Sequence, residues 1–173
     1  MTEKKLVVEG ETVSYHGIFN AKELYNLIEN FANERGWDRK DYKHEVLNRE
    51  THRDIIWDLR PNATISEYAK YEIHIKGSLT NVTDIEVVLD GKKTKMQKGN
   101  VKITFVGFLF TEYEKDWQSS AGWYVFRTII EKFIMKTHMD DYEAMIQKHV
   151  SMLKHEVSAY LNLTKYVSAK TQD

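Results

Sequence analysis

The sequence contains no cysteine, which excludes disulfide bonds, thiol catalysis and thiolate metal sites. It has one proline and eight glycines in 173 residues, too few for a disordered linker or a low-complexity segment. No apolar run approaches the length of a membrane span. The first residues turn polar too soon for a signal peptide, so the sequence predicts a cytoplasmic protein.

An excess of charge of one sign is also absent. The chain has 25 Lys and Arg against 26 Asp and Glu, a formal net charge of -1. With almost no net charge, the protein has no overall electrostatic attraction to nucleic acid or to an anionic membrane, so neither is an expected partner. The length suits one domain with a sizeable core. We expect a single α+β domain over residues 1–164 and a polar C-terminal tail over 165–173.

Alternation of apolar and polar residues predicts that β-strands make up most of the chain. The expected strands are 5–19, 42–49, 52–59, 66–76, 82–89, 92–97 and 101–113. Asp90-Gly91 is the strongest hairpin signal, because both residues tolerate the positive φ of a type I′ turn. Lys98-Gly99-Asn100 predicts a second turn, and Gly10 predicts a bulge in the first strand. The pattern therefore predicts an antiparallel sheet of about seven strands.

One helix interrupts the strands near the start of the chain. Apolar residues recur at helical spacing over 21–35, which predicts a helix there. Asn20 is the expected N-cap, with Glu23 as its capping-box partner three residues later. Gly36 has the position and chemistry of the residue that ends a helix.

Two further helices are expected at the C-terminus. Residues 121–137 and 140–163 each carry an apolar stripe at helical spacing. In one straight helix the two stripes would face nearly opposite directions, since each residue advances the helix by about 100°. Asp140, with Glu143 three residues later, has the chemistry of an N-cap. We therefore expect the chain to break between two helices near Thr137–Asp140.

Three stretches carry a family resemblance: HGIFNAKELYNLI at 16–28, LDGKKTKMQKGNVKI at 89–103, and the helical region from residue 121. Their order resembles the helix-grip superfamily of START and Bet v 1-like (SRPBCC) proteins. This resemblance implies a helix-grip-like α+β fold, a curved antiparallel sheet with one N-terminal helix and C-terminal helices. The stretches, with MDDYEAMI at 139–146, also resemble a group of uncharacterised small prokaryotic proteins. An open antiparallel sheet with a helical hairpin packed on one side is the alternative fold.

The concave face of such a sheet is the expected functional site, because side chains, a ligand or a partner must fill it. The superfamily resemblance implies an apolar small molecule as the ligand. The candidate ligand-binding residues are Trp57, Tyr71, Ile73, Phe105, Phe126, Phe133, Tyr142, His149 and Glu156. His149 and Glu156 are the polar members, at the edge of the apolar stripe of 140–163. As a buried pair they would offer acid–base chemistry, which is a third and least favoured hypothesis.

No catalytic residue, cofactor or metal is predicted, so the leading hypothesis is a non-enzymatic binding protein. His138 and Asp141 have the spacing of helical metal ligands, but the His-Glu-x-x-His pattern of a zinc site is missing. The alternative hypothesis is a protein-interaction or self-association module, a homo-oligomer or a complex with another protein. In that case one of the two C-terminal apolar stripes covers the sheet, and the other contacts the partner protein or a second copy of the chain.

Overall fold

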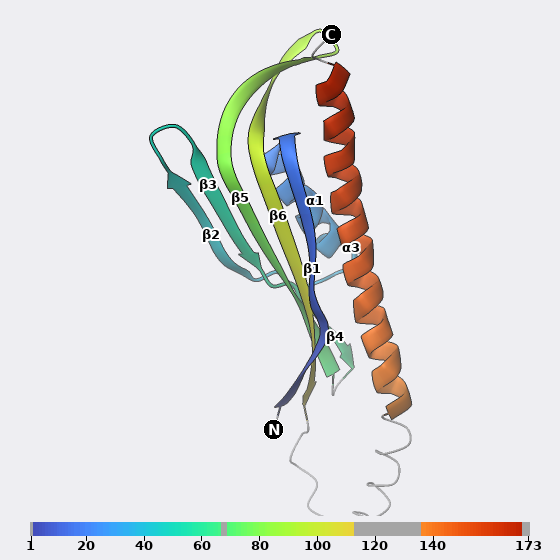
Figure 1. Cartoon of the computed structure of the whole chain (residues 1–173). Coiled ribbons are helices and arrows are strands. Elements are labelled where there is room, and N and C mark those ends of the chain that lie inside the picture. The colour runs from blue at the N-terminus through green and yellow to red at the C-terminus, as the bar shows by residue number, and fades with distance from the viewer. Residues whose placement is uncertain (1, 67–68, 113–135, 171–173) are drawn as a thin grey trace, which may run out of the picture.

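A computed structural model describes residues 2–66, 69–112 and 136–170 of the chain. The elements are β1 (Thr2–Phe19), α1 (Ala21–Glu34), β2 (Asp41–Asn48), β3 (Arg53–Leu59), β4 (Asn62–Ser66), β5 (Ala69–Leu89), β6 (Lys92–Glu112) and α3 (Lys136–Lys170). The strands form one antiparallel sheet in the order β1-β6-β5-β3-β2, and β4 pairs with β5 outside this path. Figure 1 shows a curved, unclosed sheet with both helices on its concave side. The predicted α+β class is therefore confirmed.

The long hairpin of β5 and β6 gives the sheet its curvature. Asp90 and Gly91 both have positive φ angles, 48° and 76°, so the predicted hairpin turn is confirmed. The predicted second turn at 98–100 is wrong, because β6 continues through these residues without interruption. Gly99 allows a close approach between strands there, since a Cβ atom would lie 2.9 Å from the carbonyl oxygen of Thr80. Asn81, with a φ of 55°, marks the matching irregularity in β5.

These continuous strands change the strand count. The four segments predicted as 66–76, 82–89, 92–97 and 101–113 are two strands of 21 residues each. Residues 62–65, which lie between two predicted strands, belong to β4. The described residues thus contain six strands in place of about seven. The predicted bulge near Gly10 is confirmed, because the pairing of β1 with β6 shifts between Val8 and Glu11.

Helix α1 begins at the predicted N-cap, and its cap is tied to the far end of the chain. The Asn20 side chain accepts from the backbone N–H groups of Lys22 and Glu23, at 3.1 and 3.2 Å. Glu23 does not complete the capping box by contacting the Asn20 N–H. That N–H donates instead to the hydroxyl of Tyr160 in α3 at 3.2 Å, and this hydroxyl lies 3.1 Å from the Glu23 carboxylate. Gly36, with a φ of 66°, ends the helix as predicted.

Helix α3 is one unbroken helix of 35 residues, about 50 Å long. The predicted break at Thr137–Asp140 is wrong, and Asp140 lies inside the helix, where it caps nothing. No glycine or proline occurs between residues 136 and 170, so no residue forces a break. The helix also includes residues 165–170, assigned above to a polar tail. The predicted helix 121–137 falls almost entirely outside the described residues.

The two helices cover different parts of the concave face. Helix α1 lies over β3 and its neighbours, where the Tyr25 ring meets Trp57 edge-on at 5.4 Å. Helix α3 runs along β1 and β6. It approaches β6 closely at Gly107, where an added Cβ atom would lie 2.8 Å from Ile146 Cγ2. The residues of α3 that close the core are at most 2% exposed, and they are Ile146, Val150, Leu153, Val157 and Leu161.

Candidate functional site

Most of the predicted ligand-binding residues of the sheet are core residues. Trp57, Ile73 and Phe105 are at most 2% exposed and belong to one continuous apolar cluster with α1 and α3. They fill the concave face with their own side chains. Phe126 and Phe133 lie outside the described residues. Four predicted residues remain to be placed: Tyr71, Tyr142, His149 and Glu156.

Tyr71 on β5 and His149 on α3 form a contact between the sheet and the helix. Tyr71 Oη and His149 Nδ1 share a hydrogen bond of 3.2 Å, and the two rings are 5.8 Å apart. Trp37 completes the group, with its ring 5.8 Å from Tyr71 and 5.5 Å from His149. Tyr71 and Trp37 are buried, whereas His149 is half-buried. The sequence pattern predicted two of these three residues.

Trp37 was missed, although the sequence carries a signal for it. It follows the helix-ending Gly36. The Trp37 N–H donates to the Ala32 carbonyl and the Gly36 N–H donates to the Asn33 carbonyl, both at 3.0 Å. This is the Schellman arrangement, in which the residue after the glycine usually packs back on the last turn of the helix. Trp37 does so, edge-on against Phe31 at 5.5 Å. The turn thereby points the indole ring at β5 and α3.

The surroundings keep both polar groups of this contact neutral near pH 7. Burial lowers the pKa of His149, and the positive charges of Arg35 and Lys148 lower it further. Burial also raises the pKa of Tyr71 to about 12. A neutral imidazole and a neutral phenol can each donate and accept one hydrogen bond. The pair is therefore suited to hold a polar group of a ligand.

The predicted His149–Glu156 pair is not formed. Glu156 is exposed to solvent, two turns further along α3, and His149 bonds to Tyr71. No carboxylate is therefore placed to orient this imidazole among the described contacts of His149. The arrangement offers hydrogen bonding, but it lacks the base–orienter pair of an acid–base site.

Apolar residues of β4 and of the first turns of α3 are only partly buried where they pack on the core. We call this region the open end, and it comprises Ala63, Ile65, Met139, Tyr142 and Met145. These apolar residues pack against the core but remain partly exposed. Further along α3, from Ile146 onward, the residues that face the sheet are almost fully buried. His149 lies one turn beyond Met145, at the boundary between the two regions.

Three hollows among the described residues lie away from the open end. A small one of about 20 Å³ lies beside α1 and is lined by residues such as Ile28 and Leu59. Two of about 490 and 440 Å³ lie on the outer face of the sheet, lined mainly by short polar side chains and lysines such as Ser78 and Lys102. Neither kind lies between the sheet and α3.

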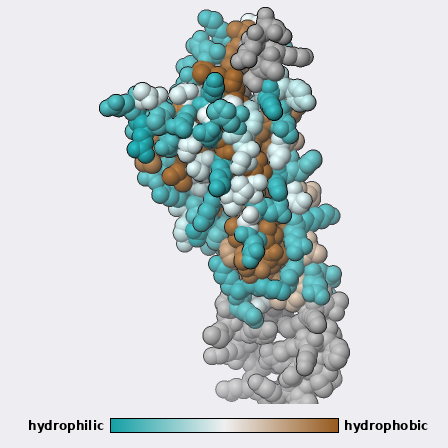
Figure 2. Space-filling view, viewed as in Figure 1, coloured by the Kyte–Doolittle hydropathy of each residue, from teal (hydrophilic) through white to brown (hydrophobic). Residues whose placement is uncertain are grey.

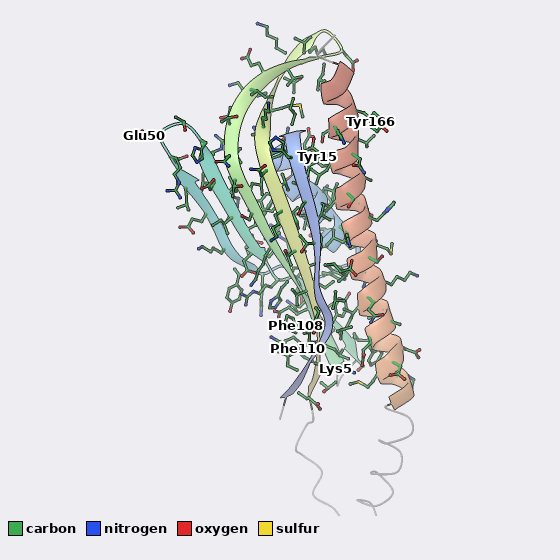
Figure 3. The ribbon with its side chains drawn as sticks, in the orientation of Figure 1. Lys5, Tyr15, Glu50, Phe108, Phe110 and Tyr166 are labelled. Atoms are coloured by element: carbon green, nitrogen blue, oxygen red, sulfur yellow. The ribbon has the colours of Figure 1, made fainter. Side chains whose placement is uncertain are left out.

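The outer face also carries an apolar patch near the end of β6. Phe108 and Phe110 are partly exposed there, beside the exposed Leu6 of β1. Figure 2 shows this apolar area in the lower half of the face, and Figure 3 labels both phenylalanines. The ammonium group of Lys4 lies over the Phe108 ring, 3.8 Å from its centre. The lysine thus covers part of the patch with a charged group.

Within the described ranges, no group of His, Cys, Asp or Glu side chains is arranged to hold a metal ion. The His138 and Tyr142 rings stack at 6.4 Å. None of the helices described combines the length and apolar character needed to cross a membrane. No protein-family model matches the sequence, and a search of the curated proteins finds no match.

Proposed function

We propose that the protein is a non-enzymatic binder of an apolar small molecule, held between the sheet and α3 at the open end. The observation that carries the proposal is the contact between the buried Tyr71 and the half-buried His149, beside partly exposed apolar residues. An apolar ligand body would cover Met139, Tyr142 and Met145, and a polar group at its end would reach His149. This combination of apolar walls and a few convergent polar groups is usual for small-molecule sites.

The electrostatics of the pair suit a ligand whose polar end accepts hydrogen bonds. Arg35 lies close enough to lower the pKa of His149 through its charge. Its guanidinium stacks on Phe31, 3.4 Å from the ring centre, and donates to the Phe31 carbonyl at 3.1 Å. The fixed positive charge favours a carbonyl, hydroxyl or carboxylate group over a cation at this position. The helix-grip resemblance of the sequence supports the same class of ligand, by analogy of fold alone.

The test is binding of the apolar fluorophore 1-anilinonaphthalene-8-sulfonate, with native mass spectrometry of the freshly purified protein. We expect saturable fluorescence and a discrete bound mass on the monomer. Met145→Gln should weaken dye binding, because it places an amide in the apolar lining. Met152→Gln is the matched control, since Met152 is 38% exposed on the same helix and outside the open end.

Two results would contradict the proposal. One is the absence of both dye binding and a bound mass. The other is equal weakening by the two methionine variants, which would locate dye binding elsewhere. Far-ultraviolet circular dichroism of each variant checks that the fold is intact, so that a loss of binding is not a loss of structure.

A protein-interaction module built on α3 is the second candidate. It is supported by exposed apolar side chains on this helix, Met152, Leu163 and Tyr166, which are 38, 66 and 76% exposed. Figure 3 shows Tyr166 on the side of α3 turned away from the sheet. Light scattering of Leu163→Ser and Tyr166→Ser tests it. A complex that persists in both variants argues against this use of α3.

A further inference from the structure

The strand β2 forms an edge of the sheet that nothing among the described residues covers. It pairs with β3 on one side only, and its side chains are exposed except for the half-exposed Glu45. Figure 1 shows the β2–β3 hairpin diverging from the rest of the sheet, and Figure 3 labels Glu50 at its tip. The backbone N–H and C=O groups along the free side of β2 therefore face solvent, as on any edge strand.

This edge is unusually apolar for a solvent-exposed strand. Tyr42, Val46 and Leu47 are 64, 46 and 37% exposed. Among the described residues, eight large apolar side chains are classed as exposed, and three of them lie on this one strand of eight residues. Exposed apolar side chains on a free strand edge are typical of a surface that pairs with another strand.

The other edge strand, β1, is protected. The bulge between Val8 and Glu11 interrupts it, and α3 packs along it. Two ion pairs fix α3 there, Lys5 with Glu143, and Lys154 with Glu11 at 2.9 Å. Bulges and covering helices are the usual ways in which proteins block edge pairing. Strand β2 has one register shift of its own, between Asp41 and Lys43, and its pairing with β3 is regular from Lys43 to Asn48.

The charged residues of β2 indicate which kind of strand can pair with it. Lys43 and Glu45 lie on the outer face, opposite Asp58 and Ile56 of β3, and form an ion pair of 2.6 Å. Their side chains are 54 and 40% exposed. A strand with this pattern is complementary to an antiparallel copy of itself, provided that the register places each lysine opposite a glutamate.

Two-fold symmetry restricts the registers in which two copies of β2 can pair. In an antiparallel pair of identical strands related by a two-fold axis, directly opposed residues share a face, so their numbers sum to an even value. Strand β2 alternates regularly from Lys43 to Asn48, and within this stretch two such registers place Glu45 opposite a charged residue of the second copy. One centres on Glu45 and places this carboxylate opposite its own copy. The other centres on His44 and places Lys43 opposite Glu45 of the second copy, twice.

We propose that β2 pairs antiparallel with β2 of a second copy of this chain, with His44 on the two-fold axis. The pairing continues the sheet from one copy into the next and joins Lys43 of each copy to Glu45 of the other. It also brings the exposed side chains of Val46 and Leu47 of each copy next to the second copy. The surface lies on the opposite edge of the sheet from α3 and is independent of the ligand proposal.

Charge reversal in the full-length chain tests both the interface and its register. Sedimentation velocity of the wild type over a concentration series should show a monomer–dimer equilibrium. Lys43→Glu or Glu45→Lys alone turns two attractive pairs into two repulsive ones, which should weaken dimerisation about tenfold or more. An equimolar mixture of the two variants should dimerise again, because every cross-strand pair is then between opposite charges. The double variant K43E/E45K should dimerise like the wild type.

Glu86→Lys is the matched control. Glu86 is an exposed glutamate that faces Lys95 within the β5–β6 hairpin, away from β2. Its reversal should leave the monomer–dimer equilibrium unchanged. A wild type that stays monomeric up to millimolar concentration overturns the proposal. A dimer that forms equally well in Lys43→Glu and in Glu45→Lys also overturns it, because the interface would then lie elsewhere. So does a mixture of these two variants that fails to dimerise.

Discussion

The hydroxyl of Tyr160 is the most informative single group to remove, because it joins the start of α1 to α3. Tyr160→Phe keeps the ring and deletes the oxygen that accepts from the Asn20 N–H at 3.2 Å. An ordinary hydrogen bond contributes about 0.5–1.5 kcal/mol, and a partner left without one costs about 1–3 kcal/mol. The contact is only partly buried, so water can solvate the freed N–H in part. We expect a loss of about 1–2 kcal/mol.

The assay is urea unfolding followed by circular dichroism, together with thermal melting. For a chain of this length each kcal/mol lowers the melting temperature by about 2–4 °C. Tyr166→Phe is the matched control, because Tyr166 lies on the same helix and is 76% exposed. It should melt like the wild type. Equal stability of Tyr160→Phe and the wild type would refute the reasoning, since the Asn20 N–H would then need no partner from α3.

The same hydroxyl predicts a change at alkaline pH. Burial raises the pKa of Tyr160, and the charge of Glu23 raises it further. A raised pKa in the folded state means that the stabilisation is complete below the unfolded pKa of about 10 and is lost as the pH rises above it. Between pH 9 and 11 the wild type should therefore lose more stability than Tyr160→Phe. Parallel losses in the two proteins would show that Tyr160 ionises as freely in the folded chain as in the unfolded one.

Two further predictions concern the contact between the sheet and α3. Gly107→Val should lower the free energy of unfolding by about 1–3 kcal/mol, measured by urea unfolding, because the valine side chain would overlap Ile146 and overpack the core. A urea midpoint equal to that of the wild type would contradict the close approach of α3. The lowered pKa of His149 means that its contribution to stability is complete above the unfolded pKa of about 6.5 and is lost as the pH falls below it. Between pH 7 and 5, His149→Gln should lose less stability than the wild type, and equal losses would show that His149 titrates normally.

The sequence predicted those parts of the fold that depend on local chemistry. Asn20 and Gly36 bound α1, and Asp90-Gly91 makes the hairpin, because each needs only its own side chain or its own φ angle. Gly99 was misinterpreted as a turn residue because a glycine serves equally well where two strands approach closely. The distinction depends on Thr80, a residue of the neighbouring strand, which no local pattern contains.

The candidate site shows the same limit. The predicted residues Trp57, Ile73 and Phe105 do face the concave side, but they fill it. Alternation assigns a residue to a face of a strand, and core residues and ligand-lining residues share that face. The Tyr71–His149 contact joins positions 78 residues apart. It depends on how α3 lies across the sheet, and the apolar stripes of the helix do not fix that angle.

The packing of α3 also has a consequence for how the chain folds during synthesis. The ribosome makes all six strands before it makes α3, yet α3 covers the apolar residues of β1 and β6 on the concave face. Pairing of β1 with β6 itself waits until Lys92–Glu112 has been made. The nascent sheet therefore lacks the cover that α3 provides until α3 has been translated. During that interval, and not in the finished protein, we expect the concave face to need a chaperone.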